Sequence, residues 1–236
     1  EDEDFQLAEQ FISGGFWRNF KIRYPETNDM YARMMYVSML LQQADQEGRD
    51  PELVEEARQD LYRGQCNCAY WHGAFGGIYL PHLRNAGFRH LIAAENRLEQ
   101  ANKRPEFWVE ATADDYNFDG RQEIRLANDQ LSTWISPAMG GQMYGFDIRS
   151  AEHNLLATIN RKPEAYHEKV RGGETDADDQ AASIHDRVVF KQEGLDQKLQ
   201  YDSGRRVSLI DHFHDNDTEL QSIISGQAME RGDFAT

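Results

Sequence analysis

Residues 66–84 read CNCAYWHGAFGGIYLPHLR, and this run lies where a polar loop gives way to a helix. Its three glycines allow a backbone to approach a ligand or another backbone closely. Tyr70 and Trp71 offer flat apolar faces with polar edges, which suit the C–H faces and hydroxyl edges of sugars. The run therefore indicates a sugar or small-ligand site. An aromatic packing seam between domains, with glycines at tight crossings, explains the same residues, and both interpretations stay open.

Helical patterns surround this run and predict a helical domain over residues 1–104. Apolar residues recur at helical spacing over 29–46, which predicts a long helix. Asn28 or Asp29 can cap the start of this helix, and Gly48 can end it.

Two more helices are expected in the same domain. Asp50 followed by Pro51 predicts a helix start, with the aspartate as cap and the proline at the first helical position. That helix continues over 53–62. A third long helix is expected from about Gly77 to Ala101, and the apolar stripes of all three indicate the core of a bundle.

Short alternating segments separated by turns follow Pro105 and predict an antiparallel β-sandwich over residues 105–236. The expected strands cover residues 107–111, 123–127, 131–135, 142–148, 154–159, 187–190 and 207–213. A polar, acidic loop is expected over 172–180. The predicted fold class is therefore α+β: a helical bundle followed by a truncated, incomplete antiparallel β-sandwich.

Charge and composition exclude several classes of partner. The 236 residues carry a net charge of −16, which disfavours nucleic acid and anionic membrane surfaces. Hydrophobic residues make up 39%, so the chain has the composition of a folded protein. No segment has the roughly 20 apolar residues of a membrane-spanning helix. A neutral substrate such as a sugar remains compatible with this charge.

The cysteines and the N-terminus predict a cytoplasmic location. Cys66 and Cys68 are one residue apart, a spacing at which a disulfide would be strained, so we expect free thiols in a reducing compartment. The chain begins with the acidic residues 1–4, unlike the basic start of a signal peptide. It also lacks an initiator methionine, so we expect it to be part of a longer protein.

One loop has the spacing of a calcium site. Asp115, Asn117 and Asp119 place oxygen side chains at alternate positions, as in the opening of a Ca²⁺ loop. Leu126 occupies the position of the usual twelfth ligand, so a calcium ion would have to use Glu123. A hairpin turn in which these side chains bond their own backbone explains the same pattern. No other cofactor is expected.

The histidines of the second domain raise the question of a metal site. They are His153, His167, His185, His212 and His214. His212 and His214 are two residues apart and share one face of a regular strand. Surface or hydrogen-bonded histidines are the alternative. We expect Arg161, Glu164 and His167 to form a polar network that faces either the helical domain or a barrel domain outside this chain.

Residues 65–84 resemble a characteristic segment of glycoside hydrolase family 57, in particular its 4-α-glucanotransferases and α-amylases. The motif RKPEAYH at 161–167 and the motif DHF at 211–213 resemble the β-domain that follows in those enzymes. The resemblance covers essentially the whole chain. It implies a retaining enzyme that acts on α-1,4-glucans or maltooligosaccharides, with its two catalytic carboxylates in a barrel upstream of this chain. No catalytic residue is therefore assigned here.

The resemblance also implies which residues bind substrate. The candidates are Asn67, Cys68, Tyr70, Trp71 and His72. Trp71 matches a residue that stacks on a sugar ring, in a helical segment that packs against the barrel mouth. Cys68 stands where the glucanotransferases usually carry an aspartate, and a thiol is a weaker hydrogen-bonding group. A non-catalytic carbohydrate-binding or interaction module is the alternative function, and a barrel in the upstream reading frame distinguishes the two.

Overall fold

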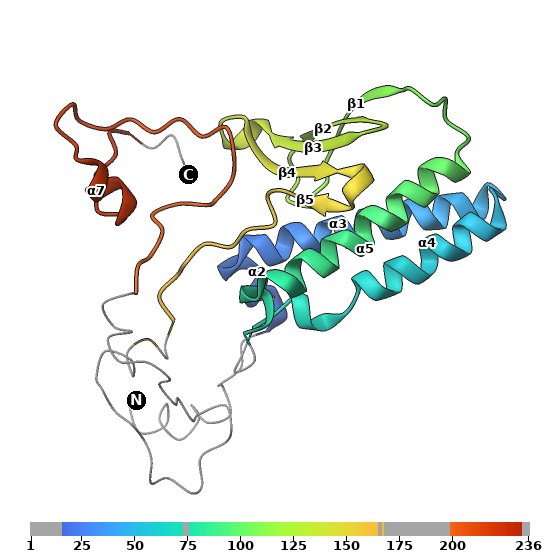
Figure 1. Cartoon of the computed structure of the whole chain (residues 1–236), viewed down its shortest axis with the longest axis horizontal. Coiled ribbons are helices and arrows are strands. Elements are labelled where there is room, and N and C mark those ends of the chain that lie inside the picture. The colour runs from blue at the N-terminus through green and yellow to red at the C-terminus, as the bar shows by residue number, and fades with distance from the viewer. Residues whose placement is uncertain (1–15, 73–75, 165–166, 168–198, 233–236) are drawn as a thin grey trace, which may run out of the picture.

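The computed structural model describes residues 16–72, 76–164, 167 and 199–232 (Figure 1). In this part of the chain, helices come first, an antiparallel sheet follows, and an extended segment with one short helix comes last. The predicted α+β class is confirmed. Three predicted features lie outside the described residues: the loop over 172–180, the strand over 187–190, and His185.

The helix expected over 29–46 begins earlier than the sequence pattern predicts, and a short helix that was not expected precedes it. Helix α2 spans Trp17–Arg23, and helix α3 spans Pro25–Gln46. The cap predicted at Asn28 or Asp29 is wrong, because Pro25 occupies the first turn and the helix starts there. Tyr24 precedes the proline and is held out of the helical conformation, which separates the two helices. Gly48, with a φ of 62°, follows the end of α3 as expected.

The next two helices are joined by the segment that carries the sequence motif. Helix α4 spans Pro51–Gly64, and the Asp50 carboxylate accepts hydrogen bonds from two backbone N–H groups of its first turn, as predicted. Helix α5 spans Pro81–Ala101. Two short 3₁₀ turns stand between them, η1 at Asn67–Ala69 and η2 at Gly77–Tyr79. The helix predicted from Gly77 therefore starts as a 3₁₀ turn and is interrupted at Leu80, which is extended because a proline follows it.

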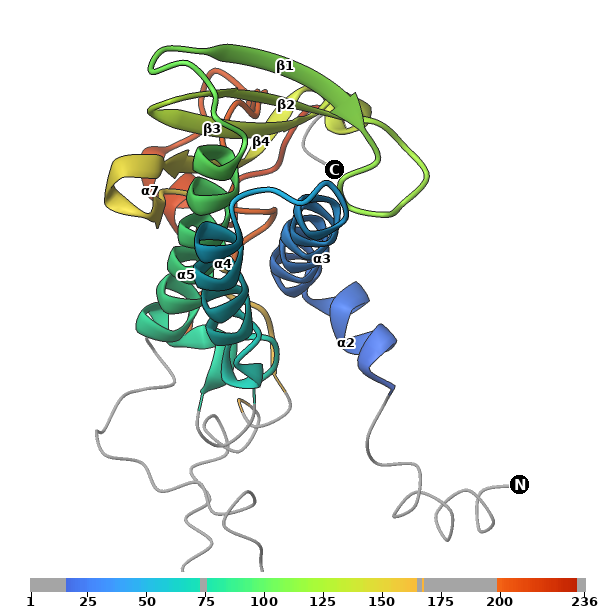
Figure 2. The same ribbon diagram turned by 90° about the vertical axis from the view of Figure 1, so that its right-hand side faces the viewer.

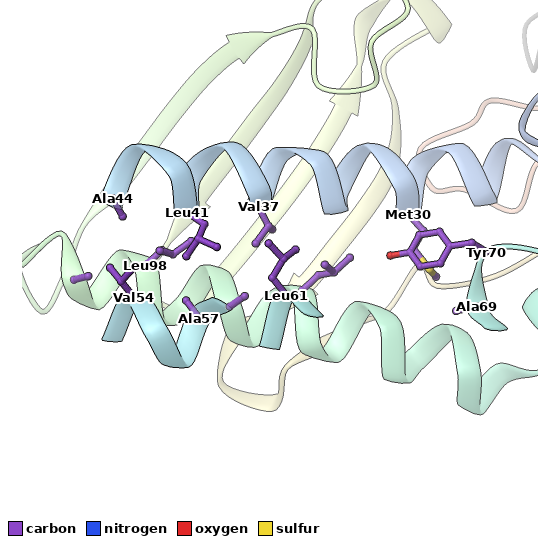
Figure 3. Close-up of a cluster of buried hydrophobic side chains, with 13 residues drawn as sticks. Met30, Val37, Leu41, Ala44, Val54, Ala57, Leu61, Ala69, Tyr70 and Leu98 are labelled. Atoms are coloured by element: carbon purple, nitrogen blue, oxygen red, sulfur yellow. The ribbon is translucent and has the colours of Figure 1, made fainter. Parts of the chain in front are cut away.

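Helices α3, α4 and α5 enclose the main hydrophobic core (Figure 3). Its largest aliphatic side chains are Met30, Val37, Leu41, Val54, Leu61, Leu91 and Leu98. Two glycines let the helices cross closely. A Cβ on Gly64 would lie 2.8 Å from Leu91 Cδ2, and a Cβ on Gly87 would lie 3.2 Å from Met30 Sδ. Among the described residues, no helix combines the length and the apolar character that crossing a bilayer requires.

The sheet is a meander in which each strand pairs with the next. Its strands are β1 at Val109–Asp114, β2 at Glu123–Asn128, β3 at Leu131–Ser136, β4 at Gln142–Ile148 and β5 at His153–Asn154. Asn128 closes the turn between β2 and β3, because its Oδ1 accepts from the backbone N–H groups of Gln130 and Leu131.

Two predicted strands do not form as expected. In the segment 154–159 only Asn154 belongs to β5, because the Asn154 Oδ1 accepts from the Leu156 N–H and turns the chain. The segment 207–213 makes a single bridge, between Ser208 and Met143, and Leu209 adopts a φ of 61° that ends it. The described residues contain one sheet, and its outward face exposes Leu126 and Leu131.

The sheet packs on α3 and α5 through buried charges rather than through aliphatic side chains. Arg33 of α3 lies 2.5 Å from Glu95 of α5 and 2.7 Å from Asp147 of β4. Arg125 of β2 and Arg149 after β4 also contact Glu95, at 2.5 and 3.3 Å. Burial opposes ionisation of Glu95, but these three arginines lower its pKa to about 2. We call these five residues the buried charge cluster.

Candidate functional site

The motif segment lies at the end of the bundle opposite the point where the chain enters β1 (Figure 2). It connects the C-terminus of α4 to the N-terminus of α5. The Ile78 N–H donates to the Trp71 carbonyl at 2.7 Å, which closes the loop between the two 3₁₀ turns. Gly77 makes this contact possible: its φ is +47°, and a Cβ there would lie 1.9 Å from the Trp71 oxygen. The backbone of Trp71 is therefore fixed against η2.

The five candidate substrate-binding residues differ in their exposure to solvent. Trp71 is 38% exposed, and Asn67 and Cys68 are also exposed. Cys66 and Cys68 are free thiols, as predicted, and the Cys68 Sγ lies 3.6 Å from the Asn67 Oδ1.

Tyr70 is the exception to this exposure. It is buried in the main core, and its hydroxyl donates to the Gly64 carbonyl at 2.7 Å. Its buried ring and its hydroxyl bond pack the loop against the helices.

His72 joins a polar cluster whose members are far apart in the sequence. Its members are Tyr24, His72, Tyr79 and Glu164, which we call the tyrosine–glutamate cluster. The hydroxyls of Tyr24 and Tyr79 both donate to Glu164 Oε1, at 2.5 and 2.6 Å. His72 Nε2 lies 2.6 Å from the Tyr24 hydroxyl.

The hydrogen bonds of this cluster determine its protonation. Because the Tyr24 hydroxyl donates its hydrogen bond to Glu164, His72 has to donate from Nε2 to the Tyr24 oxygen. Burial, followed by the hydrogen bond to Glu164, raises the pKa of Tyr24 to about 12. Burial lowers the pKa of His72, against the opposing effect of the Glu164 carboxylate. Both shifts favour the neutral forms of Tyr24 and His72.

The tyrosine–glutamate cluster joins segments that are far apart in the sequence. Tyr24 precedes α3, His72 and Tyr79 flank the motif loop, and Glu164 follows the sheet. The Arg23 side chain also donates to the Pro163 carbonyl at 2.5 Å. Glu164 Oε1 accepts from both tyrosine hydroxyls, so the cluster ties the motif loop to Tyr24 and to the segment that follows the sheet.

Of the polar network expected at Arg161, Glu164 and His167, Glu164 meets Tyr24 and Tyr79 of the helical domain. Arg161 instead forms an ion pair with Asp202 at 2.6 Å. His167 accepts from the Glu164 N–H and lies 3.0 Å from the Tyr201 hydroxyl. Tyr24 and Tyr79 were not among the site residues predicted from the sequence. Tyr79 lies inside the quoted run, but nothing local indicates that its hydroxyl meets residue 164.

The candidate calcium loop bonds its own backbone. Asp115 accepts from the N–H groups of Asp119 and Gly120, at 3.0 and 2.9 Å. Glu123 is buried and accepts from the N–H groups of Tyr116 and Asn117, at 3.0 and 3.2 Å. These contacts are those of the hairpin-turn alternative, and the same oxygens are the ones that a calcium ion would need.

Comparison with known proteins identifies relatives along the whole chain. Residues 15–98 match the family model described as "Alpha-amylase/4-alpha-glucanotransferase, middle domain", and residues 115–236 match the C-terminal model of the same description. Alpha-amylase 1 of Dictyoglomus thermophilum is 38% identical over 90% of this chain and 29% of its own length. A 4-alpha-glucanotransferase of Thermococcus kodakarensis is 33% identical over 100% of this chain and 33% of its own length.

A solved structure shows the same arrangement. The crystal structure of 4-alpha-glucanotransferase from Thermococcus litoralis matches 98% of this chain and 30% of its own, with a TM-score of 0.72 and 32% sequence identity. The chain therefore spans about a third of the length of the relatives it matches.

Proposed function

Because this chain belongs to the α-amylase/4-α-glucanotransferase family, of glycoside hydrolase family 57 type, we propose that it supplies the substrate-handling part of a retaining enzyme. That enzyme cleaves or transfers α-1,4-glucan chains, and its substrates are α-glucans or maltooligosaccharides. The printed names of the relatives, α-amylase and 4-α-glucanotransferase, support this substrate class.

The exposed side chain of Trp71 is the observation that carries the proposal. It is 38% exposed, whereas the neighbouring Tyr70 is only 6% exposed. Its backbone is fixed by the contact with Ile78, and the next residue, His72, is anchored to Tyr24. An aromatic face on a rigid base can stack on a glucose ring without first being ordered, which favours binding.

Asn67 and Cys68 lie on the same loop and offer polar groups beside this face. A thiol is a weak donor and acceptor, so we assign Cys68 a smaller share of sugar binding than the aspartate that the resemblance predicts there. The exposed, free state of both cysteines supports the cytoplasmic location.

Three buried carboxylates among the described residues, Glu95, Asp147 and Glu164, do not support a catalytic role. Glu164 is held by two tyrosine hydroxyls, and Glu95 and Asp147 are each 1% exposed beneath the sheet. We therefore place the nucleophile and the acid/base in the upstream barrel that the resemblance implies, with that barrel as the partner of the motif loop.

Substitution of Trp71 in the full-length enzyme tests the proposal. Trp71→Ala should lower kcat/KM for maltooligosaccharides by an amount that corresponds to about 1–3 kcal/mol, by analogy with aromatic stacking on other flat rings. Loss of a buried tryptophan would instead cost about 3–5 kcal/mol of folding stability. Because Trp71 is exposed, we expect an almost unchanged melting temperature.

Trp108→Ala is the matched control, because Trp108 lies just beyond the far end of α5, where Arg104 stacks on it at 4.4 Å. It should leave kcat/KM close to the wild-type value. If Trp71→Ala unfolds the protein, or changes kcat/KM no more than Trp108→Ala does, then Trp71 is a packing residue and the proposed subsite is wrong.

A further inference from the structure

His212 and His214 meet Glu230 on the surface of the C-terminal segment. One ligand atom from each of the three side chains can be chosen so that all three atoms lie within 4.8 Å of one another. Among the residues that the structure describes, this is the one group of histidine, cysteine and acidic side chains with that property. Ring nitrogens and carboxylate oxygens are both ligands of zinc and similar ions.

The backbone holds the three side chains together. The Arg231 N–H donates to the Phe213 carbonyl at 2.7 Å, so the segment around Phe213 runs beside the segment around Glu230. His212 and His214 are two residues apart and project to the same side. Their rings are stacked, with centroids 6.2 Å apart and planes inclined by 3°.

The hydrogen bonds of the two histidines orient them as metal ligands. His214 Nδ1 lies 3.1 Å from the Met229 carbonyl, and because a carbonyl only accepts, Nδ1 carries the proton. The lone pair of the neutral ring is then on Nε2. Metal-binding histidines commonly donate their other N–H to a backbone carbonyl in this way.

His212 faces the carboxylate directly. Its Nδ1 lies 2.5 Å from Glu230 Oε1. A divalent ion that takes the place of the proton between these atoms would be bound by both, while His212 stays neutral with its proton on Nε2. Tetrahedral zinc with bonds of about 2.0–2.1 Å requires ligand atoms about 3.4 Å apart, a change that rotation of these partly exposed side chains can provide.

We propose that His212, His214 and Glu230 form a binding site for a first-row divalent transition metal ion of the zinc class. Two imidazoles and one carboxylate leave a fourth position for water, and the softer imidazole ligands favour zinc-class ions over calcium. A bound ion would link residues 212–214 to Glu230 across the intervening segment 215–229. This site is separate from the candidate calcium loop and from the motif loop around Trp71.

A zinc titration of the full chain tests the proposal. Cys66 and Cys68 are exposed thiols that can bind zinc themselves, so the titration uses a Cys66→Ser/Cys68→Ser background. After removal of metal with a chelator, calorimetry should show one zinc ion per chain with a micromolar or tighter Kd. His212→Ala and His214→Ala should each weaken binding at least tenfold, and His82→Ala, which removes an exposed histidine elsewhere, should leave the Kd unchanged.

Amide hydrogen exchange adds a second measurement, which does not depend on the affinity for zinc. Zinc should slow amide hydrogen exchange in 212–214 and 229–231 in the background protein, and should not do so in His214→Ala. Circular dichroism checks that each variant is folded, and Glu230→Gln replaces any variant that is not. Saturable binding that survives both histidine substitutions overturns the proposal. So does the absence of binding below millimolar zinc, or displacement of zinc by an equal concentration of calcium.

Discussion

Gly77 is the single residue on which the geometry of the motif loop depends most directly. Any larger residue brings a Cβ to 1.9 Å from the Trp71 oxygen, and the φ of +47° is one that L side chains rarely adopt. Gly77→Ala should therefore lower the free energy of unfolding by more than the roughly 1–3 kcal/mol of backbone strain alone. Denaturant unfolding monitored by tryptophan fluorescence measures this.

Gly48→Ala is the control for backbone strain. Gly48 also has a positive φ, +62°, but a Cβ there meets nothing within 4 Å. Its substitution should cost about 1 kcal/mol. If both alanine variants lost the same free energy of unfolding, the close contact with Trp71 would contribute nothing to the cost of Gly77→Ala.

The candidate site could be predicted from sequence only in part. The motif run indicated Trp71 and its exposed neighbours because aromatic and glycine residues are locally unusual. It could not separate Trp71 from Tyr70, since one faces outward and the other enters the core only after the helices pack. The bond between Tyr24 and Glu164 joins residues 140 positions apart, and no local pattern predicts such a contact.

At the scale of elements, the interface between helices and sheet should respond to pH through Asp147. Burial raises the pKa of Asp147 to about 6, although Arg33 opposes the shift. The unfolded value is about 3.9, so the folded chain binds this proton more tightly. The stability that it contributes is fully present below about pH 4 and is lost as pH rises through about 6. Glu95, Arg125 and Arg149 are the other charged groups that face it.

Asp147→Asn removes this titration. Relative to the wild type, the variant should therefore gain stability as pH rises from about 4 to about 7, and melting temperatures across that range measure the gain. Asp217→Asn, at an exposed position, should show a constant difference from the wild type. A constant difference for Asp147→Asn as well would mean that Asp147 does not titrate in this window.

Calcium should have little effect on the loop before β2. The oxygens of Asp115, Asp119 and Glu123 accept from backbone N–H groups of the same loop, so the turn is stable without an ion. A calcium titration followed by melting temperature should give a shift of less than a degree or so. A rise of several degrees that disappears in Asp119→Ala would contradict this expectation.

Element prediction succeeded where the sequence pattern was local. The cap at Asp50 and the strands β2 to β4 follow from side chains within a few residues. The predicted start of α3 is too late, because the helix begins at Pro25 and the predicted caps, Asn28 and Asp29, lie inside it. The segment 207–213 has the composition of a strand, but pairing partners and not composition decide whether a strand forms.

At the scale of the whole molecule, this chain alone should show no amylase or glucanotransferase activity on maltooligosaccharides. We assign the nucleophile and the acid/base to the barrel domain that the resemblance implies, and this chain would lack both without that domain. Reducing-end and chain-transfer assays on the purified chain check this. Turnover that disappears when a carboxylate of this chain is substituted would show that the assignment is wrong.

The buried charge cluster has a consequence for how such genes can recombine. A crossover in the connection between Ala101 and Val109 would join the helices of one relative to the sheet of another. Glu95 would come from one parent, and Arg125, Asp147 and Arg149 from the other. A mismatch would leave a charge without a partner in a buried interface, at a cost of about 3–5 kcal/mol. Viable chimeras should therefore inherit these four residues and Arg33 together, although the crossover point lies in an exposed loop.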